Sequence, residues 1–202
     1  MKRHLLAILT TLALSITLIG CMGKVKYPEY YTLNVPPPPD PPVQEGVHTI
    51  LAIREFRSPG YLRQGAIVYK TSPEQIGFYN YHRWAVDPRN FVTNVVADRL
   101  RASGNFAQVK LYDGRSEADY IVSGRLEKLE EVDYDGGVKV EVAISAQMAS
   151  TTTGEIVWMN SVSETGTVSH RDVHTVVSEM NRTMDRAIQK LLTPGPSAIA
   201  RK

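Results

Sequence analysis

The strongest constraint on the fold is an alternation of apolar and polar residues between positions 138 and 148, which only Ala143 interrupts. Successive side chains of a β-strand point to opposite faces of a sheet, so residues two apart share a face. The pattern therefore predicts a strand over 137–150 with one buried face and one face in contact with water. The buried face would carry Val138, Val140, Val142, Ile144, Ala146 and Met148, and the wet face Lys139, Glu141, Ser145 and Gln147.

Turn sequences on either side predict that this strand pairs with its neighbours along the chain. Asp135-Gly136-Gly137 separates it from residues 118–132, and Thr153-Gly154 separates it from residues 155–168. Aspartate and glycine are favoured in tight hairpins because these turns need positive φ angles. We predict three long antiparallel strands with one wet face.

Two segments place apolar residues at helical spacing. The first begins at Asp87, a good N-cap followed by Pro88 at the first helical position, and Gly104 supplies its stop. The second begins at Ser169, which forms a capping-box pattern with Asp172 three residues later.

Five shorter strands complete the predicted fold. Their ranges are 30–33, 47–56, 66–71, 76–84 and 107–112, and apolar residues on both faces of 47–56 indicate a central strand. The fold class is therefore α+β: a mainly antiparallel sheet with two helices packed on one face.

The N-terminus has the features of a bacterial lipoprotein signal. A basic start precedes an apolar run over 5–19, which is shorter than the about 20 residues of a membrane-spanning helix. The run ends in Leu18-Ile19-Gly20-Cys21, which looks like a lipobox, and Cys21 is the only cysteine. We predict a signal peptide over 1–20, with diacylglycerol and an N-acyl chain on Cys21. The alternative is an ordinary cleaved signal beside a chance cysteine.

Acyl chains on Cys21 would hold the protein on a membrane, since each buried methylene contributes about 0.8 kcal/mol. Met22 favours the outer membrane, because aspartate at this position tends to retain lipoproteins of enteric-type bacteria in the inner membrane. The expected location is the cell envelope, lipid-anchored and facing the periplasm.

The mature chain divides into three parts. Residues 21–46 form a lipidated tether with a short strand and the proline-rich stretch 36–42, residues 47–192 form the α+β domain, and residues 193–202 form a flexible tail. The proline-rich stretch is either a stiff spacer or a ligand for a proline-recognising partner, and we favour the spacer.

Composition excludes several classes of function. Hydrophobic content of 43% and charged content of 22% are typical of a globular chain, and a net charge of +2 gives no basic face for nucleic acid. No nucleophile motif or phosphate-binding glycine loop is present, so we expect no enzyme, no cofactor and no metal.

Three groups of titratable residues were weighed as sites. His170 and His174 could share a helix face as metal ligands, but solvated histidines are favoured. His82 is interpreted as a packed or interfacial histidine rather than a catalytic one. The acidic run Glu127, Glu130, Glu131, Asp133 and Asp135 lacks the pattern of a calcium loop and is interpreted as a solvated hairpin end.

Aromatic residues cluster between positions 69 and 84. Strand alternation prevents Tyr69, Phe78, Tyr79, Tyr81 and Trp84 from all facing one core. Tyrosine and tryptophan favour interfaces, so packing and partner binding both stay open. The working hypothesis is a partner-binding surface formed by Tyr79, Tyr81 and Trp84.

The central part of the chain resembles the ABC-type transport auxiliary lipoproteins, the PqiC/YmbA-like group. The resemblance rests on Tyr61-Leu62, Gly65-Ala66-Ile67-Val68-Tyr69, Thr71-Ser72, Tyr81, Trp84-Ala85 and Pro88, with Tyr30-Tyr31-Thr32-Leu33 before them and Leu100 and Phe106 after them. It covers nearly the whole mature chain. It implies a fold similar to the amino-terminal domain of TolB, and no catalytic residues.

The resemblance also implies partners. Such proteins accompany ABC transporter components and MCE-domain proteins that move lipids between the two membranes, and a homo-oligomer stays open. The alternative from a different class is an envelope lipoprotein that regulates cell-wall synthesis or assembles a secretion apparatus. Fold alone does not separate these roles.

Overall fold

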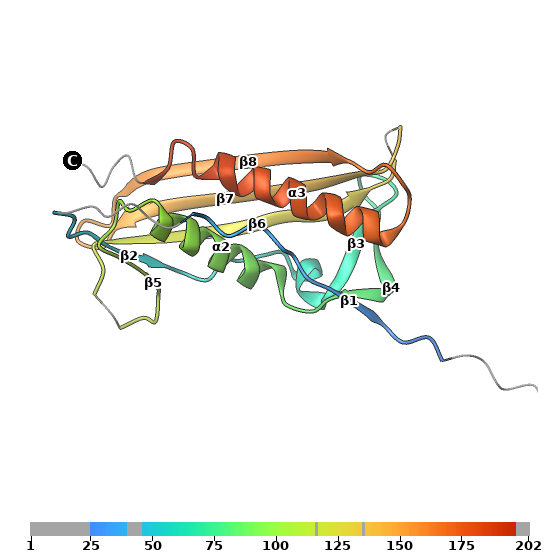
Figure 1. The fold of residues 1–202 in the computed structure, drawn as a ribbon, viewed down its shortest axis with the longest axis horizontal. Coiled ribbons are helices and arrows are strands. Elements are labelled where there is room, and N and C mark those ends of the chain that lie inside the picture. The colour runs from blue at the N-terminus through green and yellow to red at the C-terminus, as the bar shows by residue number, and fades with distance from the viewer. Residues whose placement is uncertain (1–24, 40–45, 116, 135, 197–202) are drawn as a thin grey trace, which may run out of the picture.

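The computed structural model describes residues 25–39, 46–115, 117–134 and 136–196, and Figure 1 shows how the elements are arranged. Within these residues, eight strands and two α-helices form the fold. The strands are β1 (Glu29–Tyr31), β2 (Ile50–Ile53), β3 (Ala66–Lys70), β4 (Ile76–Trp84), β5 (Gln108–Leu111), β6 (Tyr120–Val132), β7 (Lys139–Ser150) and β8 (Ile156–Thr167). The helices are α2 (Pro88–Ala102) and α3 (Val173–Leu191), and a short 3-10 helix, η1, spans Gly60–Gln64.

All eight strands belong to one mixed sheet. β6, β7 and β8 pair antiparallel as predicted. The other edge of β6 is shared, because β2 pairs in parallel with its start and β3 in parallel with its end. β5 extends the sheet from β2, and β4 and β1 extend it from β3. The α+β class is confirmed, with several parallel pairings in addition to the predicted antiparallel ones.

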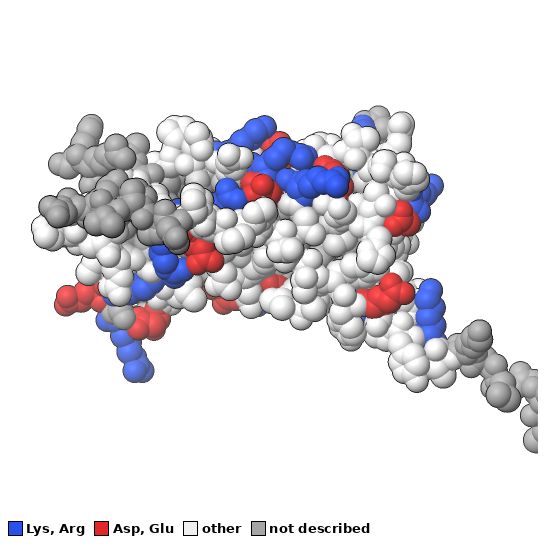
Figure 2. Space-filling model, in the orientation of Figure 1, with Lys and Arg blue, Asp and Glu red and all other residues white. Residues whose placement is uncertain are grey.

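Both helices cover the same face of the sheet, α3 against β7 and β8 and α2 against β5 and β6 (Figure 1). The predicted apolar positions of β7 from Val140 to Met148 are buried beneath them. Figure 2 shows Lys and Arg side chains gathered over α3 on this side, with acidic groups among them. They are paired: Arg182 lies 3.0 Å from Glu179, and Lys190 lies 2.6 Å from Glu164.

The N-cap of α3 differs from the predicted one. Asp172 caps the helix, and its Oδ1 accepts a hydrogen bond from the Thr175 N–H at 2.9 Å. The hydroxyl of Ser169 instead lies 3.1 Å from Nδ1 of His170. A carboxylate placed three residues before the free N–H satisfies the helix start better than the more distant serine. Asp87 caps α2 as predicted.

Part of the predicted tether belongs to the folded body. β1 pairs in parallel with the end of β4, and Leu33 and Val35 are buried in the common core. Pro38 and Pro39 line a shallow pocket beside Leu100 of α2 and Leu192 after α3. The first prolines therefore come after the chain has entered the sheet, and residues 22–28 are the segment between Cys21 and β1.

No helix among the described residues has the length and apolar content that crossing a bilayer requires.

Candidate functional site

Cys21, the predicted lipidation site, lies outside the described residues. Its acylation stays a prediction from the sequence. The structure describes the chain from residue 25, close to the point where an anchor would enter the body.

The aromatic segment contains a large irregularity in β4. Ala66 pairs with Arg83, but Val68 pairs with Phe78, so five residue steps on β4 oppose two on β3. The additional residues lie between the two paired positions, where Tyr79 and Tyr81 stand. A bulge of this kind redirects side chains that strict alternation would have placed on one face.

The three predicted partner-binding residues have different environments. Trp84 is 5% exposed and packs in the core, so it is not available as a surface contact, which corrects that part of the hypothesis. Tyr79 is half-buried and its hydroxyl donates to Glu131 Oε2 at 2.7 Å. Burial, followed by this hydrogen bond, raises the pKa of Tyr79. Only Tyr81, at 40% exposure, offers a mainly free ring, and Lys26 Nζ lies 4.7 Å above it.

His82 takes part in a contact that joins β1 to the body. The Tyr31 hydroxyl donates to Glu29 Oε2 at 2.8 Å and lies 3.0 Å from Nδ1 of His82. The rings of His174 and Tyr31 pack in a T-shaped arrangement with 5.6 Å between centroids. Desolvation, with the Glu29 carboxylate, raises the pKa of Tyr31 to about 12. These contacts describe a packed histidine.

The remaining titratable groups form no metal site among the described residues, where no three His, Cys, Asp or Glu side chains are placed to share an ion. His174 is occupied by its contact with Tyr31, and its predicted companion His170 lies beside Ser169.

Two members of the acidic run are buried, although its composition indicated a solvated hairpin end, and Asp135 lies outside the described residues. Glu130 and Glu131 are each 2% exposed, on opposite faces of β6. Glu130 lies 3.8 Å from Lys70 and accepts from the Tyr61 hydroxyl at 3.3 Å. Desolvation raises the pKa of both carboxyls, and Lys70 opposes this at Glu130. The sheet buries these residues because β3 pairs alongside them, which the local sequence does not reveal.

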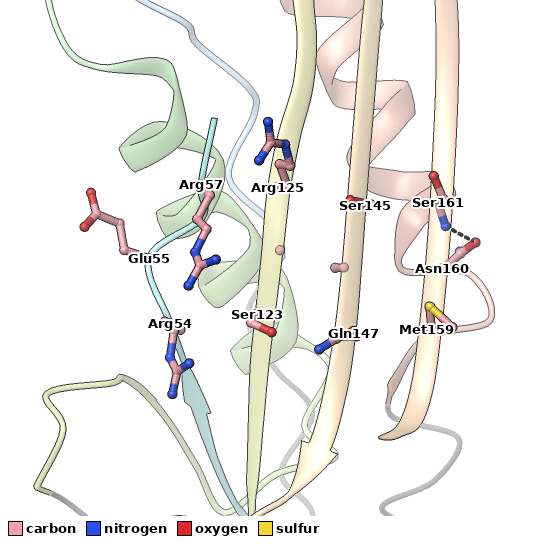
Figure 3. A pocket seen from close by; sticks show the side chains of 12 residues that line it. Arg54, Glu55, Arg57, Ser123, Arg125, Ser145, Gln147, Met159, Asn160 and Ser161 are labelled. Atoms are coloured by element: carbon pink, nitrogen blue, oxygen red, sulfur yellow. Dashed lines mark hydrogen bonds between the residues drawn. The ribbon is translucent and has the colours of Figure 1, made fainter. Parts of the chain in front are cut away.

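The open face of the sheet carries a surface that the sequence analysis missed. A trough of about 420 Å³ crosses β6, β7 and β8 on the side away from the helices (Figure 3). Outward-facing polar residues of the three strands line it, and arginines stand along one side. The lining includes Ser123, Ser145, Gln147 and Ser161, with Arg54, Arg57 and Arg125 as the arginines.

Main-chain hydrogen bonds hold the arginine-bearing segment against β6. The Arg54 N–H donates to the Val122 carbonyl at 2.8 Å, and the Arg57 N–H donates to the Gly124 carbonyl at 2.9 Å. The Leu126 N–H donates to the Arg57 carbonyl at 2.9 Å. The segment therefore continues the line of β2 along β6, and the main-chain positions of both arginines are fixed by the sheet.

The arginines differ in how their charge is compensated. Arg125 Nε lies 2.7 Å from Glu127 Oε2. Arg54 instead lies over the ring of Tyr112, with 4.8 Å to its centroid. Within the described part of the chain, neither Arg54 nor Arg57 forms an ion pair with a carboxylate. Two guanidinium charges therefore stand beside a polar floor.

Glu55 does not supply the missing charge. It lies between the two arginines in sequence, but its carboxylate is 3.7 Å from Arg89 of α2. Glu55 lines the outer side of the trough, and Figure 3 shows its side chain pointing away from β6. Planar guanidinium groups in this arrangement suit carboxylates or phosphates, which they bind with two parallel hydrogen bonds.

The chain matches one family model and several solved structures. Residues 31–191 match a family model described as "ABC-type transport auxiliary lipoprotein component". No curated protein matches. Among solved structures, protein XCC0632 from Xanthomonas campestris, of the DUF330 family model, has a TM-score of 0.71 at 15% identity, over 86% of this chain and 96% of that one.

Two further structures are similar. An uncharacterized protein has a TM-score of 0.61 at 16% identity, over 87% of this chain and 97% of that one. The hypothetical protein CT253 from Chlamydia trachomatis has a TM-score of 0.50 at 7% identity, over 73% and 95%. At such identities, these likenesses show the fold alone.

Proposed function

Because the chain belongs to the ABC-type transport auxiliary lipoprotein family, we propose that it is a non-catalytic, membrane-anchored component of an ABC/MCE-type system that moves lipid between the membranes of the bacterial envelope. The observation that carries the proposal is the family match, which spans residues 31–191 and thus nearly all of the predicted mature chain. Its action would be binding rather than turnover.

The anchor in this proposal is Cys21, carrying diacylglycerol and an N-acyl chain. The protein would be held at the outer membrane and face the periplasm, where a transporter crossing from the inner membrane has to arrive. Mass spectrometry of the protein extracted from its own membrane tests this step. A mature N-terminus at Cys21 with acyl chains supports it, and an unmodified thiol contradicts it.

The trough on the open sheet face is the proposed docking surface for a protein partner. Arg54 and Arg57 would take an acidic segment of an MCE-domain protein or of an ABC transporter subunit. Two observations support this: the arginines lack carboxylate partners in the described chain, and their backbone is held rigidly on β6. Binding at this surface would not require its backbone to reorder, which lowers the entropic cost of association.

Tyr81 is the proposed second contact with the partner, because it is the exposed member of the three aromatic residues that the sequence indicated. Tyr79 would stabilise the bulge beside it through its hydrogen bond to Glu131. Replacing Tyr81 by alanine should weaken partner binding without unfolding the domain. Tyr134→Ala is the matched control, since Tyr134 is exposed to the same extent, 42% against 40%. Equal loss with both variants would contradict a specific role for Tyr81.

The test of the whole proposal is purification of the full-length protein from its own envelope in mild detergent after crosslinking. An MCE-domain protein and an ABC permease in the eluate would support it. A peptidoglycan synthase or a secretion ring in their place would contradict it and favour the alternative lipoprotein roles.

Charge reversal localises the contact. The double variant Arg54→Glu and Arg57→Glu should lower recovery of the partner by about tenfold or more, because like charges would then face each other at the interface. Arg101→Glu with Arg182→Glu is the control, since these arginines are exposed on the helix side, where single surface ion pairs contribute little to stability. Recovery that falls equally with the control would remove the trough from the proposal.

A further inference from the structure

Exposed aromatic and basic side chains lie together at one end of the molecule. Tyr27 is 77% exposed and Tyr30 of β1 is 63% exposed. Lys26 and Arg83 are also exposed, and Arg83 is the cross-strand neighbour of Tyr30. We call Lys26, Tyr27, Tyr30 and Arg83 the β1 edge.

The cations of the β1 edge are not neutralised by the protein. Within the described residues, neither Lys26 nor Arg83 forms an ion pair, and Lys26 lies over the ring of Tyr81. The nearby Glu29 is occupied by the Tyr31 hydroxyl and lies 3.5 Å from His82 Nδ1. Two positive charges therefore remain available to an anionic surface.

Chain length ties this edge to the predicted anchor. Lys26 stands five residues after Cys21, and a fully extended chain advances at most about 3.6 Å per residue. An acylated Cys21 therefore keeps Lys26 within about 18 Å of the bilayer surface. β1 is paired with β4, so Arg83 stays beside Tyr30 in the sheet, and Tyr30 follows Lys26 by only four residues.

We propose that the β1 edge lies on the phospholipid headgroups, with the long axis of the domain directed away from the membrane. Tyrosine rings favour the headgroup level because they combine an apolar ring with a polar hydroxyl. Lys26 and Arg83 would contact lipid phosphates, and each such charge strengthens binding to an anionic surface. This rests on the lipid anchor in the proposed function and adds the orientation of the body.

The orientation has a consequence for the transport system. β5 and the loop after it lie at the opposite end of the long axis (Figure 1), so that end would project into the periplasm. The trough lies on the open face, where Ser123 and Arg125 place it over the first half of β6. A partner docked there would be held at a fixed height above the membrane.

The experiment measures how deeply a spin label sits when the full-length acylated protein is reconstituted in vesicles of phosphatidylethanolamine and phosphatidylglycerol. Cys21 is the only cysteine and is blocked by acylation, so an introduced cysteine takes the label alone. Val86→Cys reports on the β1 edge, since Val86 is 57% exposed and follows Ala85, whose N–H donates to the Tyr31 carbonyl at 2.8 Å. Leu111→Cys in β5, at 51% exposure, reports on the far end.

The expected result is a label at Val86 that a lipid-soluble relaxant reaches and a water-soluble one does not, with the reverse at Leu111. Lys26→Glu with Arg83→Glu should shift the Val86 label toward water. The ratio of protein with the β1 edge on the headgroups to protein with this edge in water should fall by about fivefold for each cation lost. Lys110→Glu with Arg115→Glu, at the far end, should not change it.

The outcomes separate the two proposals. Protein that floats with the vesicles while both labels are equally accessible to water would overturn the membrane-facing edge and leave the anchor intact. A shift with the far-end charge reversals as large as with those of the β1 edge would also overturn it. Protein that carries no acyl chain on Cys21 would remove the anchor and the orientation together.

Discussion

The two faces of the sheet differ in what they contact. The face beneath α2 and α3 is continuous apolar core, with Val140, Val142 and Ile144 all at 0% exposure. The other face of the same strands is open and polar, and it carries the trough with Arg54 and Arg57. The first face accounts for the stability of the domain and the second offers groups that the fold leaves unused. Substitutions on the two faces should therefore separate stability from binding.

The largest expected effect is on the helix-covered face. Ile144→Ala should lower the free energy of unfolding by about 2–5 kcal/mol, because the cavity beneath α3 cannot collapse fully. Its neighbour on the open face, Ser145, loses only a hydrogen bond to Glu127 when replaced by alanine, which costs about 0.5–1.5 kcal/mol. Urea denaturation measures both. Equal losses would contradict the division between the faces.

A smaller effect is expected at Gly124 in β6. A Cβ there would lie 2.3 Å from the ring of Phe56 and 2.7 Å from the Ser145 carbonyl oxygen, and Phe56 is fully buried. Gly124→Ala should cost about 1–3 kcal/mol through overpacking. Ser123→Ala, one residue away on the open face, should change the midpoint of urea unfolding much less. An unchanged midpoint for Gly124→Ala would show that the ring can move aside.

The adjacent carboxyls of Glu130 and Glu131 predict a pH dependence. Folding raises both pKa values above the ordinary 4.5, so the folded state binds protons more tightly than the unfolded state. Their contribution to stability is full below 4.5 and is lost as the pH rises through the raised pKa values. The slope for one proton is at most about 1.4 kcal/mol per pH unit.

Glu131→Gln should flatten this pH dependence, since the amide oxygen can still accept from Tyr79 but does not ionise. Glu130→Gln should flatten it as well, since desolvation also raises the pKa of Glu130 against the opposing charge of Lys70. Unfolding free energies from urea titrations between pH 4 and pH 8 measure the slopes. A slope unchanged in both variants would assign the dependence to other groups.

The smallest effect on stability is expected in the trough. Arg54→Ala with Arg57→Ala should change the free energy of unfolding by no more than about 0.5 kcal/mol per residue, as for other exposed side chains that hold no ion pair. The same variant should lose partner recovery in the crosslinking experiment. A large fall in the thermal midpoint would show that these arginines support the fold instead.

The sequence predicted the positions of the helices and strands better than it predicted which strands pair with each other. Turn glycines and period-two alternation placed β6, β7 and β8 within two residues of their observed ends, and Asp87 and Pro88 placed the start of α2. These signals are local. The mixed character of the sheet was missed because parallel pairing joins segments that are far apart along the chain, such as β2 with β6.

The roles of the candidate site residues also depend on long-range contacts that local sequence signals do not reveal. Tyr81 is exposed, but Trp84 is in the core, because the bulge in β4 changes which side chains face outward. Arg54 and Arg57 were not singled out, because their significance depends on a sheet neighbour more than sixty residues away.

The sequence alone thus determined the α+β class, the long hairpins and the start of α2, because periodicity and capping each reside in a few neighbouring residues. The anchor at Cys21 stays a prediction. The tertiary structure decided that β2 and β3 share one edge of β6, that Glu130 and Glu131 are buried, and that two uncompensated arginines face a polar trough. Burial and charge compensation depend on which distant segments meet, and no local pattern contains that information.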